Sequence, residues 1–461
     1  MPLTRRALIL SATAASVVAP LASAALSHPS APLPNGLWRS RSTADLVVFD
    51  QRARRTYTCY SSAVALVDES PLEEVERETL DAQLENDSRL ELEYWGTVTR
   101  FQYDRINDWP TPPPLGNGNW VSDPGMTVDA FFEVLAGHFA FARERGLDWR
   151  ALRAECDAAL RRGPVTPDHL FDTLAATLRH LEDGHGSLSD MERYAESRSS
   201  TSRLYQAWKA AGGRPLDGDS SAGFHHDWLD HVQGRILLGA GHLAAQDVVA
   251  WGQLPSGVGY ISLMLCESLS EVEGGHADVE VARQTFDRIL RDLAGVRGII
   301  VDLRFNNGGW DRVPLALASH FTDRTLQAFT KQPVRQGAGL DTQTITITPA
   351  GGARYTGPVA VLTSDATISA AEVGTLGLRA LPNTRSFGRP TYGALSDPFY
   401  FRLPNGWKGA VSNEIYRASD GQVYEGVGIP PDHPSAEPSA SAFWETLDAQ
   451  LRDAETWLLA L

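Results

Sequence analysis

The chain has 461 residues, 43% of them apolar, and a formal charge of −16 at pH 7. This length predicts roughly two or three domains, and the apolar content suffices for a sizeable core. The acidic balance argues against a nucleic-acid-binding face, because such a face needs clustered lysine and arginine.

The first residues indicate an export signal. Arg5 and Arg6 form a positive start, residues 7–21 are apolar and almost uncharged, and the small residues 22–24 suit a cleavage site. The apolar run is too short for a membrane-spanning helix, and the paired arginines resemble a twin-arginine signal. We therefore expect residues 1–24 to be removed and the protein to be periplasmic or extracellular. A buried N-terminal helix is the alternative.

Three widely spaced cysteines, Cys59, Cys156 and Cys266, form no CxxC pair. They predict neither a zinc cluster nor a redox motif. Whether two of them form a disulfide is left open by their spacing.

Residues 25–120 predict a small antiparallel β domain with linkers at its ends. The segments 25–36 and 109–120 are rich in proline and glycine and read as linkers. Between them lie short strand-like runs, such as RLELEY (89–94), in which apolar and acidic residues alternate. That period of two indicates a half-buried strand.

The remaining chain is predicted to form a helical subdomain, a larger α/β core and a final helix. Residues 121–190 carry apolar residues at helical spacing, and Thr166 with Pro167 suits a helix start. Residues 191–435 alternate strands and helices, which favours an α/β core with a partly parallel sheet. Residues 436–461 predict a C-terminal helix. The expected fold class is α/β, or α+β multidomain.

The segment TSDATISAAE (363–372) places Ser369 where an apolar strand gives way to a helix. One interpretation is a helix cap, because Ser369 and Glu372 match the S-x-x-E capping box. The other is a nucleophile whose oxyanion is held by the Ala370 N–H and by an N–H of Gly308 or Gly309. The local pattern alone favours the cap.

A nucleophilic serine also needs a base and a carboxylate that orients it. His185 follows a helix within the glycine-flanked segment DGHG, and a neutral imidazole accepts a proton near pH 7. Glu425 precedes a rigid Pro-Pro turn in VYEGVGIPPD. By position alone, each of these two side chains is more typical of a solvated surface group.

Four segments together resemble the C-terminal processing peptidases, also called tail-specific proteases. VRGIIVDLRFNNGG resembles the strand-and-glycine motif of this family, and TSDATISAAE resembles its nucleophile motif. LEDGHGSL and YEGVGIPPD are similar to segments of the tricorn-like branch, which is related to the interphotoreceptor retinoid-binding protein. The resemblance covers roughly residues 125–435.

The resemblance implies a ClpP/crotonase-like catalytic core and a set of site residues. These are a Ser369 nucleophile, a His185 base, a Glu425 that orients the ring, and oxyanion donors at Gly308 and Ala370, with Gly309 as the competing glycine.

The sequence departs from the family pattern at three places. Many relatives use a serine–lysine dyad, but Ala394 stands at the place of that lysine, so His185 is needed as the base. Gly184 stands where the tricorn-like branch tends to have a serine. No PDZ domain is visible between residues 188 and 258.

We therefore expect an exported serine-type peptidase that hydrolyses peptide bonds through an acyl-enzyme. Its partner would be a peptide or protein substrate, without nucleic acid, a membrane span, a metal or an organic cofactor. The alternatives are a non-catalytic binder of hydrophobic ligands or peptides on the same fold, and an esterase or amidase. The sequence leaves the substrate, the cleavage preference and the oligomeric state open.

Overall fold

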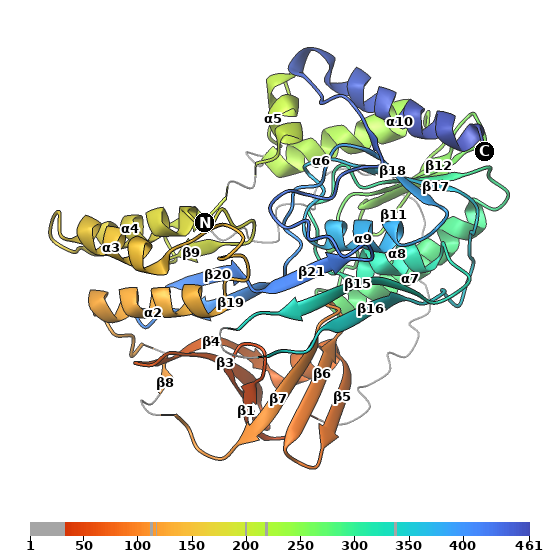
Figure 1. Cartoon of the computed structure of the whole chain (residues 1–461). Helices are drawn as coiled ribbons and strands as arrows, with labels where there is room; N and C mark the ends of the chain where they lie inside the picture. The colour runs from red at the N-terminus through yellow and green to blue at the C-terminus, as the bar shows by residue number, and fades with distance from the viewer. Residues whose placement is uncertain (1–32, 111–113, 117, 199–200, 217–219, 336–338) are drawn as a thin grey trace.

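The computed structural model describes residues 33–110, 114–116, 118–198, 201–216, 220–335 and 339–461. The predicted export signal, residues 1–24, lies outside this part of the chain. The described residues form a mixed α/β protein with four sheets, as expected for the fold class. Figure 1 shows one sheet at the bottom of the view, a helical layer on the left and the largest α/β layer on the right.

The N-terminal part forms an eight-stranded sheet of order β5-β6-β7-β1-β2-β3-β4-β8. The short helix α1 (Leu72–Glu78) connects β4 to β5. Every neighbouring pair is antiparallel except β4 with β8. Leu90 and Leu92 are fully buried with Trp38 in the core of this sheet, as the alternation along RLELEY predicts. The strands are β1 (Gly36–Ser40), β2 (Leu46–Phe49), β3 (Ala53–Cys59), β4 (Val64–Pro71), β5 (Thr79–Glu85), β6 (Arg89–Tyr94), β7 (Arg100–Ile106) and β8 (Pro114–Leu115).

Three helices cover a four-stranded sheet of order β10-β9-β20-β19. Side-chain caps fix their starts: Asp123, Asp148 and Thr166 accept backbone N–H groups of the first turns. Two of the four strands come from near the chain end, so the helical layer is tied to the C-terminal half. The elements are α2 (Pro124–His138), α3 (Trp149–Leu160), α4 (Pro167–Arg179), β9 (Ser187–Ser189), β10 (Tyr194–Glu196), β19 (Pro398–Arg402) and β20 (Lys408–Ser412).

A seven-stranded sheet of order β11-β12-β13-β14-β17-β18-β22 forms the largest layer. Its strands from β13 onward are parallel, and side chains alternate between two apolar clusters, one on each face. Residues 299–301 (IIV) are fully buried. A parallel strand that is covered on both faces needs such a continuous apolar run, because both sets of its side chains pack in a core. The strands are β11 (His242–Ala244), β12 (Val249–Gln253), β13 (Gly259–Leu263), β14 (Ile299–Asp302), β17 (Val359–Thr363), β18 (Thr384–Gly388) and β22 (His433–Pro434).

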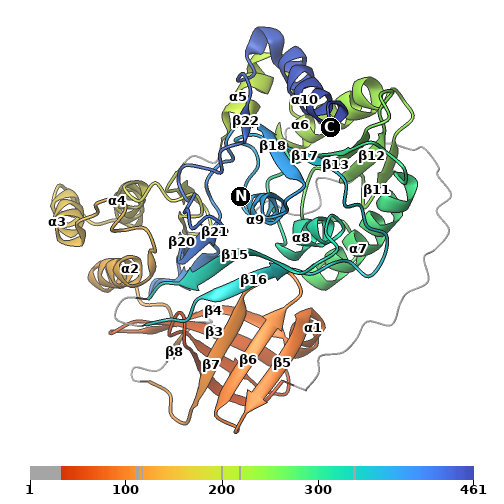
Figure 2. The same cartoon turned by 45° about the vertical axis from the view of Figure 1, so that its right-hand side comes forward.

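Helices cover both faces of this sheet (Figure 2). One face packs against α7 (Gly275–Asp292), α8 (Arg312–Ser319) and α9 (Ala370–Arg379). The other packs against α5 (Arg203–Ala210), α6 (Ser220–His231), the π-helical turn η1 (Val232–Ile236) and α10 (Phe443–Leu459), which the 3-10 turn η2 (Ala440–Ala442) precedes. A three-stranded sheet of order β16-β15-β21 lies between the core and the N-terminal sheet, with β15 (Leu326–Pro333), β16 (Gln343–Ile347) and β21 (Glu414–Ala418).

All three cysteines are free thiols. In the described ranges, no helix combines the length and apolarity that a membrane crossing requires. Within the same ranges, no three His, Cys, Asp or Glu side chains gather as metal ligands.

A buried ion pair fixes the end of β14, the strand that leads into the glycine segment. Arg304 and Asp302 are each 1% exposed, and Arg304 Nη2 donates to Asp302 Oδ2 at 2.6 Å. Arg304 Nη1 also donates to the Leu447 carbonyl of α10 at 2.6 Å. A buried charge is tolerated only when it is paired and hydrogen-bonded, so this arginine joins β14 to α10.

Arg304→Met is expected to lower the free energy of unfolding by about 3–5 kcal/mol, because it leaves the Asp302 carboxylate buried without its cation. Urea denaturation followed by circular dichroism measures the loss. The matched control is Arg203→Met, since Arg203 pairs with Glu437 at 3.1 Å but its side chain is 63% exposed. That variant is expected to change stability by less than about 1 kcal/mol. Equal losses in the two variants would contradict the role assigned to burial.

Candidate active site

Ser369 has an uncommon backbone conformation at the start of α9. Its φ is 57° and its ψ is −124°, in a region that residues with a side chain rarely adopt. Such a conformation costs about 1–3 kcal/mol and persists only where the surroundings hold it. Here the preceding residue is held as well, because Ile368 N–H donates to the Asn306 carbonyl at 3.0 Å. The sharp turn presents the half-buried Ser369 hydroxyl beyond the carboxyl end of β17.

Glu372 holds this turn from inside the protein. Its fully buried carboxylate accepts the Ser369 N–H at 3.2 Å and the Ala394 N–H at 2.8 Å on one oxygen. The other oxygen accepts the Thr391 hydroxyl at 2.6 Å and the Gly393 N–H at 2.7 Å. Burial raises the pKa of Glu372 to about 7, although these donors act in the opposite direction. The predicted interaction of Glu372 with the Ser369 N–H is therefore present, and it supports the exposed turn.

The loop that carries His185 packs beside this turn. A Cβ added to Gly184 would lie 2.5 Å from the Ala394 Cβ, so only glycine fits there. Ala394 and Ser369 donate to the same Glu372 oxygen, so Ala394 links the His185 loop to the Ser369 turn. Gly184 and Ala394, two of the three departures noted in the sequence, thus lie against each other.

Asp183 anchors the His185 loop to β20. Its buried carboxylate accepts the His185 N–H at 3.1 Å, the Ser412 N–H at 2.8 Å and the Ser412 hydroxyl at 2.6 Å. Sequence reasoning gave Asp183 no role, although an aspartate two residues before a loop histidine is a recognisable Asx-turn pattern. Its partner Ser412 is 229 residues away in the chain and could not be foreseen.

The His185 imidazole is held in its neutral form. Burial lowers the pKa of His185, while Asp183, Asp397 and the Ser396 backbone act in the opposite direction. The ring atom Nδ1 is buried and has no hydrogen-bond partner among the described residues. A neutral imidazole can donate from one ring nitrogen and accept a proton on the other.

Glu425 lies beside the segment that follows Ala394. Its Oε2 accepts the Leu395 N–H at 2.8 Å and the Ser396 N–H at 3.0 Å. Its Oε1 is buried and, in the described part of the chain, has no partner, so no hydrogen bond joins Glu425 to His185. Burial raises the pKa of Glu425 to about 8, and the neighbouring Asp183 and Glu372 raise it further.

Gly308 and Ala370 adjoin Ser369, Gly309 follows Gly308, and the three predicted oxyanion donors differ in availability. Gly308 has a φ of 96°, and a Cβ there would lie 2.7 Å from the Ser369 Cβ, so the close approach requires glycine. However, the Gly308 N–H already donates to Asn306 Oδ1 at 2.9 Å. Ala370 is the first residue of α9, where helix N–H groups lack intrahelical partners. For the N–H groups of Ala370 and Gly309, the described residues supply no acceptor.

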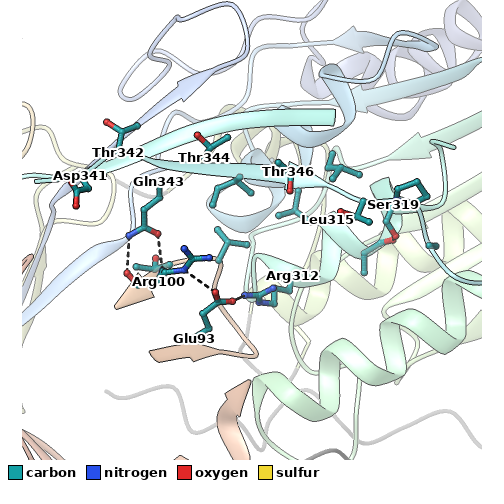
Figure 3. Close-up of a pocket in the computed structure, with 18 of the residues that line it drawn as sticks. Glu93, Arg100, Arg312, Leu315, Ser319, Asp341, Thr342, Gln343, Thr344 and Thr346 are labelled. Atoms are coloured by element: carbon teal, nitrogen blue, oxygen red, sulfur yellow. Dashed lines mark hydrogen bonds and ion pairs between the residues drawn. The ribbon is translucent and has the colours of Figure 1, made fainter. Parts of the chain in front are cut away.

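A cleft of about 980 Å³ lies elsewhere, between the N-terminal sheet and the core (Figure 3). The side-chain amide of Gln343 accepts the Arg100 N–H at 2.9 Å and donates to the Arg100 carbonyl at 2.9 Å. Glu93 pairs with Arg100 at 3.1 Å and with Arg312 at 3.0 Å. Neither Ser369 nor His185 lines this cleft, so it is a joint between layers and not the chemical site.

Comparison with known proteins identifies the core. Residues 257–435 match the model of peptidase family S41. The resemblance to the C-terminal processing peptidases that the motifs predict is therefore confirmed. The matched S41 segment contains Ser369, both glycines and Glu425, whereas His185 precedes it. No curated protein was found to match the chain.

Solved structures show the same fold. A candidate peptidase from Parabacteroides merdae is 21% identical, with a TM-score of 0.59 over 74% of this chain and 98% of its own. Mature CPAF in complex with lactacystin is 11% identical, with a TM-score of 0.50 over 73% of this chain and 98% of its own.

Asn306→Ala is expected to destabilise the protein by about 2–3 kcal/mol, because it leaves the buried Gly308 N–H and Leu263 carbonyl without partners. The neighbouring Asn307 is exposed, so Asn307→Ala serves as the matched control and is expected to change stability by less than about 0.5 kcal/mol. Thermal and urea denaturation compare the two variants. Similar stabilities would show that the Asn306 side chain does not hold the glycine segment.

Proposed function

We propose that this S41 peptidase homologue is a serine-type peptidase with Ser369 as nucleophile, His185 as general base and Glu425 as the carboxylate that orients the ring. The observation that carries the proposal is the strained turn at Ser369, which lies against Gly308 and beside the His185 loop. A non-glycine residue with positive φ needs support, and Glu372 with Asn306 provides it at this one turn. The substrate would be a peptide or protein. Export through residues 1–24 stays a prediction.

The chemistry proceeds through an acyl-enzyme. The Ser369 Oγ forms a bond to the carbonyl carbon of the scissile peptide while its proton moves to His185. When the C–N bond breaks, its electron pair stays on the leaving nitrogen, which takes that proton. A water molecule then gives a proton to His185 and attacks the acyl carbon, and the proton returns to Ser369 as the ester C–O bond breaks.

The negative charge on the tetrahedral oxygen would rest on the N–H groups of Ala370 and Gly309. The positive end of the α9 dipole points to the same place. Removing one such donor commonly lowers the rate by about two to three orders of magnitude. In this proposal Gly308 contributes its small size and its φ, because its own N–H is occupied by Asn306.

Two buried atoms without partners support the role of Glu425. His185 Nδ1 and Glu425 Oε1 both lack a hydrogen bond in the described structure. Buried polar atoms that stay unpaired destabilise a fold, and catalytic hydrogen bonds often tighten only when substrate binds. We place the contact between these two atoms in the substrate-bound state.

Ser369→Ala is expected to abolish peptide hydrolysis and labelling by a fluorophosphonate probe, because it removes the hydroxyl that attacks in the proposed reaction. Its stability should stay within about 1 kcal/mol of the parent. Mass spectrometry of the labelled peptide reads the result. Ser268→Ala is the control, since Ser268 also has a positive φ, 60°, but is exposed. Undiminished labelling of Ser369→Ala would remove the central assignment.

The labelling rate of the parent should fall on acidification with a midpoint below 6.5, the ordinary pKa of histidine, because burial lowers the pKa of His185. A lowered pKa means that the neutral ring, which is the active form, survives to lower pH. The folded state also loses stability as the pH falls through the unfolded pKa, so circular dichroism must show an intact fold at each pH. A midpoint above 6.5 would contradict the environment described for His185.

A further inference from the structure

A buried cluster of charged side chains surrounds Lys331 on β15. Lys331 is 0% exposed, and its Nζ pairs with Asp397 Oδ2 at 2.8 Å and Glu414 Oε2 at 2.6 Å. It also donates to the Tyr416 hydroxyl at 2.8 Å and to the Thr99 hydroxyl. A buried ammonium needs compensating carboxylates, and nothing in the proposed chemistry uses this lysine.

The cluster adjoins the His185 loop. Asp397 follows Ser396, whose N–H is bound by Glu425. The Asn413 N–H donates to the Asp397 carbonyl at 3.3 Å, and Pro398 pairs with Ser412 across β19 and β20. The same Ser412 holds Asp183, the anchor of His185. The His185 loop and the Asp397 segment are therefore held by two adjacent residues, Ser412 and Asn413.

Asp397 is the ionised carboxylate in this region. Burial would raise its pKa, but the charge of Lys331 and hydrogen bonds from Lys331 and Thr99 hold the pKa below its ordinary value. Burial instead raises the pKa of Glu414 to about 7 and that of Asp311 to about 8. Lys331 thus lowers the pKa of Asp397 below its ordinary value, whereas burial dominates at Glu414 and Asp311.

Two carboxylates raise the pKa of His185: Asp183 lies on its own loop, and Asp397 lies before β19. The Glu425 carboxyl group lies in the loop after β21. Burial raises the pKa of Glu425 to about 8. The Asp183 carboxylate accepts three hydrogen bonds that hold the loop in place. Lys331 and Thr99 hold Asp397 Oδ2, and the Asp397 side chain is 34% exposed.

We propose that Asp397 is a positioning residue for His185: its carboxylate, held by Lys331 and by Thr99 of the N-terminal layer, stabilises the protonated imidazole during catalysis. This inference rests on the proposed function. Lys331, which sequence reasoning could not connect with the site, then acts at a distance as the clamp of that carboxylate. Thr99 precedes β7, so the N-terminal layer takes part in holding the site.

Asp397→Asn tests the proposal through the pH dependence of fluorophosphonate labelling at Ser369. A nearby negative charge raises the pKa of a histidine, so its removal makes the ring less basic. The midpoint of the fall in labelling rate on acidification, here called the acidic limb, is expected to shift to a pH about one unit lower. The maximal labelling rate above this midpoint is expected to fall about tenfold. Asp397→Glu is expected to restore the position of the limb. A limb that coincides with that of the parent overturns the proposal.

Glu414→Gln is the matched control, because Glu414 binds the same Lys331 but does not act on His185. It is expected to lower stability without moving the limb. An equal displacement in this variant would assign the effect to the cluster as a whole and would overturn the specific role of Asp397. Absence of labelling in the parent protein would instead refute the proposed function.

The double variant Lys331→Gln/Asp397→Asn guards against misfolding of the single variant, since it leaves no buried ammonium without its carboxylate. It is expected to show the same downward displacement of the limb. A folded double variant with the parental pH profile also overturns the proposal.

Discussion

The Glu372 carboxylate is the interaction on which the site depends. It is fully buried, and its four donors come from the Ser369 turn and from residues 391–394. Without these bonds, the positive φ of Ser369 would relax toward an ordinary helix start, because strain persists only where several contacts oppose it. The same carboxylate sets the position of Ala394, against which the His185 loop packs. One buried group thus fixes two partners of the proposed reaction.

Glycines transmit this arrangement across the site. Gly308 lets the backbone approach the Ser369 Cβ, and Gly184 lets the His185 loop approach Ala394. A side chain at either place would meet atoms closer than van der Waals contact allows. Gly184 and Ala394 lie against each other, which explains why both residues are small.

Several features could be predicted because the information is local. The apolar run before Ser369 and the S-x-x-E pattern gave the strand, the helix and the Glu372 interaction. The alternation along RLELEY predicted the half-buried strand β6. Thr166 predicted the start of α4, where its side chain accepts a backbone N–H as the helix cap. The expected oxyanion donor Gly308 shows the limit, since its N–H is taken by Asn306 two residues earlier. Two residues in a turn can meet in several ways, and only the folded backbone selects one.

The sequence by itself determined the periodicities, the order of strands and helices, and the motifs that resemble S41 peptidases. Only the tertiary structure decided that Lys331 is buried, that it binds Asp397 and Glu414, and that Thr99 joins them. It likewise decided that Asp183 finds Ser412. The physical reason is that hydrogen bonds and ion pairs between distant segments depend on how sheets and helices dock. A local pattern records which face of an element is apolar, but not which polar group of another element it will meet.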